Sequence, residues 1–139
     1  MYFESARRLT HREKEGIRIL DLRGQLKTGD SESNLRSAIN ALAKDNVTQI
    51  VLNLAEVTRI DSDGLEALVL CGTQIRECGG ALKLAGLSIE HLSLNILTKL
   101  NTVFEVFADE QDAVNSFFPS RARRHYDVLE WVQEQEKTR

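Results

Sequence analysis

The residues with the clearest capacity for chemistry lie in one short segment, where Ser62 stands between two aspartates and two residues before Gly64. Asp61 and Ser62 are residue types that cap helix N-termini, where backbone N–H groups lack partners and the helix dipole is positive. A phosphate on Ser62 would bring a charge of about −2 to this positive end, and it would change the surface offered to a partner. Capping alone explains the same residues, so their spacing leaves both interpretations open. A ligand phosphate or carboxylate would also fit there, although Asp61 and Asp63 oppose an added anion.

The sequence lacks the motifs of the common enzyme classes: it has no P-loop, GxGxxG, GxSxG or HExxH motif. No histidine lies near Ser62 to act as its base. Cys71 is expected in the middle of a helix and Cys78 at a helix C-terminus, where no dipole lowers a thiol pKa. The three histidines are scattered, at His11, His91 and His125. We therefore expect no catalytic residue, no cofactor and no metal.

Apolar runs alternate with helical periods along the chain, which predicts an α/β fold with a mixed, mostly parallel sheet and covering helices. The expected strands are residues 17–22, 49–54, 81–85 and 104–107. Apolar residues at helical spacing follow at 35–43, 65–75, 89–100 and 113–118. The expected N-caps are Asp30 or Ser31, Asp61 or Ser62, Ser88, and Asp109. Gly79-Gly80 and Pro119 are expected to end the second and the last of these helices.

The composition fits one globular domain with a short appendage. The chain has 139 residues, of which 42% are hydrophobic and 28% charged, with a net charge of −3. An acidic balance disfavours nucleic acid as a partner, and the basic cluster at 121–125 lacks interleaved aromatic residues. No apolar stretch approaches the about 20 residues of a membrane-spanning helix, and the N-terminus lacks the apolar core of a signal peptide. We expect a cytoplasmic protein without membrane insertion.

The chain divides into three predicted parts. Residues 1–14 form an N-terminal segment, either an edge strand or loose, and residues 15–118 form the α/β domain. Residues 119–139 form a linker and an amphipathic helix with Val128, Trp131 and Val132 on one face. This helix either folds back on the domain through Trp131 or docks on a partner, including a second copy of the chain in a homodimer.

At the Ser62 segment the sequence resembles a known family. Asp61-Ser62-Asp63-Gly64-Leu65 follows the apolar run 51–54 and precedes Cys78-Gly79-Gly80-Ala81-Leu82-Lys83-Leu84. Together these residues resemble the STAS domain, the sulfate transporter and anti-sigma factor antagonist domain. The resemblance covers residues 15–118 and includes Leu22-Arg23-Gly24-Gln25-Leu26. It implies a small α/β sandwich, which agrees with the alternation of strands and helices.

The resemblance implies a regulatory protein that switches partners and catalyses nothing itself. In the family's bacterial antagonists, the partner is an anti-sigma factor that is also a serine kinase of the histidine-kinase-like ATPase type. That kinase phosphorylates the serine after the aspartate of the motif, which is Ser62 here, and a phosphatase restores the hydroxyl. The partner would then dock on the segment around Ser62, which comprises Arg59, Asp61, Ser62, Asp63, Gly64 and Glu66.

The chain departs from the family pattern at two positions. Asp63 stands where the family often has a second hydroxyl residue, and Lys27 stands where many antagonists have an acidic residue after a Gly-x-Leu turn. These changes leave room for a second hypothesis. STAS domains also serve as small cytoplasmic subunits of ABC transporters that export lipids, and in that role Ser62 would be an interface residue without a phosphate. A small α/β enzyme or nucleotide-binding domain is a third possibility, because such folds bind ligands at the carboxyl ends of their strands.

Overall fold

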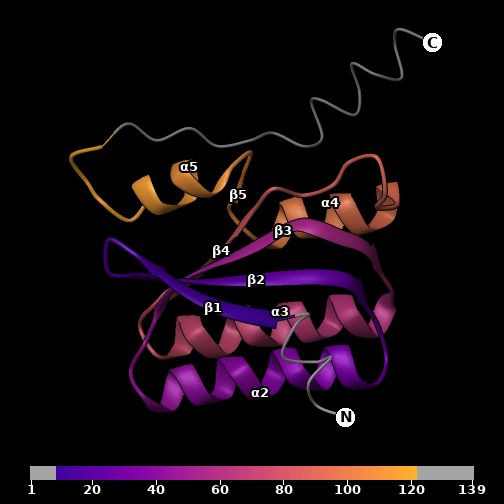
Figure 1. Cartoon of the computed structure of the whole chain (residues 1–139), viewed down its shortest axis with the longest axis horizontal. Coiled ribbons are helices and arrows are strands. Elements are labelled where there is room, and N and C mark those ends of the chain that lie inside the picture. Colours follow the sequence, from indigo (N-terminus) through magenta and orange to yellow (C-terminus); the bar gives the residue numbers. More distant parts are fainter. Residues whose placement is uncertain (1–8, 122–139) are drawn as a thin grey trace, which may run out of the picture.

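The computed structural model describes residues 9–121, which fold around one five-stranded sheet of order β1-β2-β3-β4-β5 (Figure 1). β1 pairs with β2 in antiparallel fashion, and the other neighbouring strands pair in parallel. The strands are β1 (Leu9–Lys14), β2 (Ile17–Leu26), β3 (Gln49–Ile60), β4 (Ala81–Ala85) and β5 (Val106–Phe107). The helices are α2 (Asp30–Lys44), α3 (Ser62–Glu77), α4 (Leu94–Val103) and α5 (Glu110–Asn115). This arrangement confirms the predicted α/β fold with a mixed, mostly parallel sheet.

Alternate side chains of each strand point to opposite faces of the sheet. The two faces are covered by different helices. Leu20, Leu52 and Leu84 lie in the larger core, on the face along which α2 and α3 run side by side (Figure 1). Val51 lies on the opposite face, in a smaller core with Val114 of α5. Both faces of the central strands are therefore buried, as their near-continuous apolar sequences predict.

β3 is longer than the strand predicted over residues 49–54. It continues to Ile60, because Arg59 pairs with Gln25 and Ile60 pairs with Leu26 of β2. Residues 55–60 therefore belong to the strand, and α3 begins at Ser62, directly after its N-cap Asp61. As a result β2 and β3 end side by side, and the turns that follow them meet at one edge of the sheet.

The predicted cap of α2 is also wrong. Its N-cap residue is Gly29, and neither Asp30 nor Ser31 takes that position. The Ser31 hydroxyl instead accepts a hydrogen bond from the Lys27 N–H at 2.9 Å, so it closes the turn that precedes the helix.

α4 begins later than predicted. The Leu92 N–H donates to the Ser88 carbonyl at 3.0 Å, so Ser88 opens a separate turn rather than the helix. Ser93 is the N-cap of α4, and its hydroxyl accepts from the Ile96 N–H at 3.4 Å. At the other end, Phe104 is the C-cap of α4, so β5 is shorter than the strand predicted over residues 104–107.

α5 has the predicted N-cap, Asp109, whose carboxylate accepts from the Asp112 N–H at 2.8 Å. It ends at Asn115 and not at Pro119, because the Phe117 N–H bonds to the Val114 carbonyl three residues back and closes a turn. The helix predicted through residue 118 is therefore too long.

Within residues 9–121, no helix is long and apolar enough to cross a membrane. The predicted C-terminal helix and the homodimer contact through Val128, Trp131 and Val132 lie outside the described residues.

Candidate functional site

Asp61 is the N-cap residue of α3, as its type and position predict. Its backbone is extended (φ −92°, ψ −176°), and its Oδ1 accepts from the Gly64 N–H at 2.8 Å. Its carbonyl oxygen accepts from the Leu65 N–H at 2.9 Å. The hydrogen bond from Gly64 lowers the pKa of the Asp61 carboxyl below its ordinary value, and hydrogen bonds from Thr28 add to this effect. The carboxylate is therefore fixed in its charged form at the start of the helix.

Thr28, in the turn between β2 and α2, is tied to the same helix end. Its backbone N–H donates to Asp61 Oδ2 at 3.2 Å. Its hydroxyl lies 3.4 Å from the same oxygen and donates to Asp63 Oδ2. One threonine thus binds the carboxylates on both sides of Ser62.

Gly64 lies where the start of α3 packs closely against the end of β2. A Cβ atom on Gly64 would lie 2.2 Å from the Leu26 carbonyl oxygen, so no side chain fits there without moving the backbone. The same oxygen accepts a hydrogen bond from the Asp61 N–H at 3.1 Å. The end of β2 and the start of α3 are therefore held together by main-chain packing, and the position of Ser62 follows from it.

Ser62 is the first residue of α3, and its side chain is exposed. In the described part of the chain, its hydroxyl has no hydrogen-bond partner, and the carboxylates on either side of it accept hydrogen bonds from Thr28. A free, accessible hydroxyl at the positive end of a 16-residue helix is available to an approaching protein. The geometry of capping and the accessibility required of a phosphoacceptor are thus present together.

The other predicted docking residues lie near Ser62 in the sequence, at the end of β3 and in the first turns of α3. Arg59, near the end of β3, is exposed, as are Asp63 and Glu66 on α3. Gly64 is buried, so it shapes the site through its backbone and is not part of the accessible surface. The exposed charges near Ser62 on α3 are therefore acidic, and a single arginine lies at the adjoining strand.

Sequence reasoning missed Thr28. A signal was available, because Thr28 follows a parallel strand next to β3, and the carboxyl ends of neighbouring parallel strands meet at one edge of the sheet. Its partners lie 33 and 35 residues away, however, and only the register of β2 with β3 brings them within hydrogen-bond distance.

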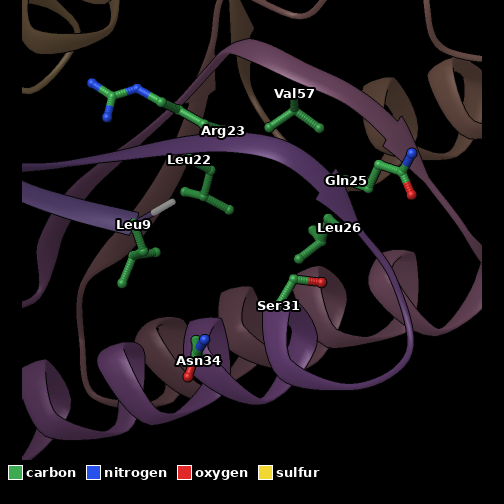
Figure 2. A pocket seen from close by; sticks show the side chains of 8 residues that line it. All are labelled: Leu9, Leu22, Arg23, Gln25, Leu26, Ser31, Asn34 and Val57. Carbon is green, nitrogen blue, oxygen red and sulfur yellow. The ribbon is translucent and has the colours of Figure 1, made fainter. Parts of the chain in front are cut away.

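The cavity beside the end of β2 is too small to be a ligand site. Figure 2 shows it between the β2 strand and the first turns of α2, with Leu22 and Leu26 reaching down toward Ser31 and Asn34. Its volume is about 20 Å³, which is close to the space of one water molecule.

Neither cysteine has the setting of a nucleophile. Cys71 is buried in α3, and burial raises the pKa of its thiol to about 12. Cys78 is exposed, at the C-cap of the same helix. In the described ranges no group of three or more histidine, cysteine or acidic residues could hold a metal ion.

Comparison with known proteins places this geometry in a family. A family model of the STAS domain matches residues 8–113. Among solved structures, the unphosphorylated anti-sigma factor antagonist SpoIIAA is 16% identical with a TM-score of 0.62, and the match covers 80% of this chain and 98% of that one. The phosphorylated form of SpoIIAA from Bacillus is 15% identical with a TM-score of 0.61, covering 78% of this chain and 98% of that one.

Two further structures share the fold. An anti-sigma factor antagonist from Mycobacterium paratuberculosis is 18% identical with a TM-score of 0.62, and the match covers 78% of this chain and 91% of that one. The murine anion transporter Slc26a9 is also 18% identical, with a TM-score of 0.57, but the match covers 74% of this chain and only 18% of the transporter. At these identities the likeness concerns the fold.

Proposed function

Because this chain belongs to the STAS domain family, we propose that it is a regulatory binding protein of the anti-sigma factor antagonist type. Its partner is an anti-sigma factor that is also a serine kinase of the histidine-kinase-like ATPase type, and the two meet in the cytoplasm. The observation that carries this proposal is the Ser62 hydroxyl, which is exposed at the N-terminus of α3 and unbonded within the described residues. The protein itself is not an enzyme and needs no cofactor.

The switch is phosphorylation of Ser62. The kinase transfers the γ-phosphoryl group of its ATP to the Ser62 oxygen, ADP leaves, and the hydroxyl proton passes to a base of the kinase. The product carries a charge of about −2 beside Asp61 and Asp63. The helix dipole and the N–H groups of the first turn stabilise that charge, so the fold remains intact. A phosphatase removes the phosphate and restores the binding form.

Phosphorylation weakens binding because the docking surface is built around the same hydroxyl. Arg59, Asp63 and Glu66 are exposed around Ser62 and form the rim that the partner covers. A phosphate at the centre of a covered surface must lose its water and lies beside two carboxylates. The phosphorylated protein therefore leaves the anti-sigma factor, which then binds its sigma factor.

A second function, that of a cytoplasmic accessory subunit of a lipid-exporting ABC transporter, is favoured by one observation. Asp63 places a permanent negative charge next to Ser62, so this corner carries acidic charge before any phosphate is added. In that function Ser62 is an unmodified contact with the transporter.

The deciding experiment incubates the purified chain with the histidine-kinase-like ATPase encoded nearest to it and with ATP, followed by mass spectrometry. We expect one phosphate, located on Ser62, and none in Ser62→Ala. Ser120→Ala is the matched control, because Ser120 is an exposed serine in the turn after α5 and lies outside α2 and α3, and this variant should be phosphorylated like the original chain.

Binding completes the test. Ser62→Asp should bind the ATPase about tenfold more weakly than the original chain. An unmodified Ser62 together with equal binding of Ser62→Asp contradicts the regulatory function. Co-purification with a permease and its ATPase would then support the transporter function.

A further inference from the structure

One ridge of α3 leads away from Ser62 across the surface. Ser62, Glu66, Leu70 and Gln74 follow one another at intervals of four residues, so they lie on the same side of the helix. Leu70 is 48% exposed, so this ridge carries one large apolar side chain open to solvent. At a rise of about 1.5 Å per residue, Leu70 lies about 12 Å along the helix from Ser62.

A groove runs beside this ridge, between α3 and α2, which lie side by side under the sheet (Figure 1). Its volume is about 500 Å³. The side chain of Gln74 donates to the Asn40 side-chain oxygen at 3.0 Å and bridges the two helices at one end. The remaining walls are Ser33, Arg36 and Ser37 of α2 and Leu70 and Cys71 of α3.

We propose that Leu70 and this groove extend the docking surface of Ser62, and that they receive an apolar side chain of the same kinase, flanked by basic residues. This inference rests on the proposed function and names the chemistry of the partner at that site. The groove is a specificity element, and it lies outside the segment to which phosphate is added.

The charges around the groove define the flanking chemistry. Glu66 is exposed on the ridge, Asp63 is exposed next to Ser62 in the same first turn, and neither makes a salt bridge to another described residue. Arg36 is already paired with Glu32 at 2.9 Å, so this pair adds no net charge at the rim. The surface between Ser62 and Leu70 is therefore acidic, and basic residues on the partner complement it.

A typical protein interface is large enough to cover both Ser62 and the groove beside Leu70. A stable interface covers about 800 Å² on each partner and about 20 residues or more on each side. A kinase that holds the Ser62 hydroxyl at its ATP therefore also covers residues one to two helical turns away. Small serine side chains on α2 leave the groove open beside Leu70, so the groove can take a side chain of the partner.

The test measures phosphorylation of Ser62 by the purified histidine-kinase-like ATPase as a function of substrate concentration. Leu70→Asp should raise KM by about tenfold or more and leave kcat within about twofold, because it removes binding and not chemistry. Leu94→Asp is the matched control: Leu94 is equally exposed, at 48%, but lies on α4. Its KM should remain that of the original chain. Glu66→Lys should also raise KM, through charge.

The outcomes separate this inference from the proposed function. If the kinase neither binds nor phosphorylates the original chain, the proposed function is wrong. The groove inference, which rests on that function, is then wrong as well. If Ser62 is phosphorylated and Leu70→Asp behaves like Leu94→Asp, only the groove inference is wrong. If circular dichroism shows that Leu70→Asp has lost its helical structure, the measurement is repeated with Leu70→Ala. A dimer in sedimentation that Leu70→Asp dissociates would show a second copy in the groove and overturn the inference.

Discussion

The hydroxyl of Thr28, in the turn after β2, donates to the carboxylate of Asp63 in the first turn of α3. The Thr28 N–H donates to Asp61 as well, so a single residue binds the two carboxylates that flank Ser62. Asp63 is one of the positions at which this chain departs from its family. Thr28 holds its charge toward the β2–α2 turn, and the Ser62 hydroxyl stays without a carboxylate partner.

Thr28→Val removes the hydroxyl and keeps the shape of the side chain. The Asp63 carboxylate then loses its partner and can turn toward Ser62, where it opposes the incoming phosphoryl group. We expect kcat/KM for Ser62 phosphorylation to fall by about fivefold, the effect of one charge at about 4 Å in water. The rate is measured with the purified histidine-kinase-like ATPase.

The Asp63→Asn background is the control for this effect. In it, Thr28→Val should change kcat/KM by less than about twofold, because no charge is left to release. An equal loss in both backgrounds would mean that Thr28 acts on the fold and not through Asp63.

Local sequence signals predicted the parts of the site that depend on neighbours in the chain. Asp61 was expected as a cap because its partner, the Gly64 N–H, lies three residues on. The fold class followed from the alternation of apolar runs and helical periods. Thr28 was not expected, since its contacts need the register of two strands far apart in sequence.

The errors have the same cause. Ser88 and Ser93 are equally good N-caps by type, and only the turn that Ser88 closes with Leu92 decides between them.

Lys83 is a buried lysine within an apolar strand, which the sequence pattern did not reveal. Its ammonium group lies 2.8 Å from the Ser116 hydroxyl, 3.0 Å from Glu105 and 4.2 Å from the Phe117 ring centre.

Gly64→Ala should destabilise the domain by about 2 kcal/mol, because its Cβ would meet the Leu26 carbonyl and the backbone must move. Gly72→Ala, on the same helix, meets only the far end of the Phe104 ring at 2.7 Å. This contact is with a side chain and not with main chain, so a small shift of the ring relieves it, and alanine favours the helix by about 1 kcal/mol; we therefore expect less than about 1 kcal/mol of loss. Urea unfolding measures both. Equal losses would mean that the Gly64 contact relaxes freely.

The two thiols should differ in reactivity. Cys71 is buried, with a pKa raised to about 12, whereas Cys78 is exposed. Since the thiolate is the reactive form, a disulfide reagent should modify one thiol of the native chain quickly and the second only on unfolding. Cys78→Ser should abolish the fast phase. A fast phase that persists in Cys78→Ser would contradict the burial of Cys71.

Arg12 joins the edge strand to α5 through two carboxylates. Its guanidinium donates to both oxygens of Asp21, at 2.5 and 2.8 Å, and also to Glu110. Asn53 donates to Asp21 Oδ1 at 2.7 Å. The hydrogen bonds from Arg12 lower the pKa of Asp21 below its ordinary value of 3.8, with Asn53 adding to the effect.

Asp21→Asn should therefore reduce the stability at pH 7 by about 2 kcal/mol, because the charged hydrogen bonds are lost from a largely buried side chain. A carboxyl whose pKa is lower in the folded state stabilises the fold above the ordinary value and loses that contribution as the pH falls through the folded value. The difference between the two proteins should be constant from pH 7 to about 5 and shrink below about pH 4. Urea unfolding at several pH values measures it, with the exposed Asp45→Asn as control. A difference that stays constant down to pH 3 would show that Asp21 acts by packing and not by charge.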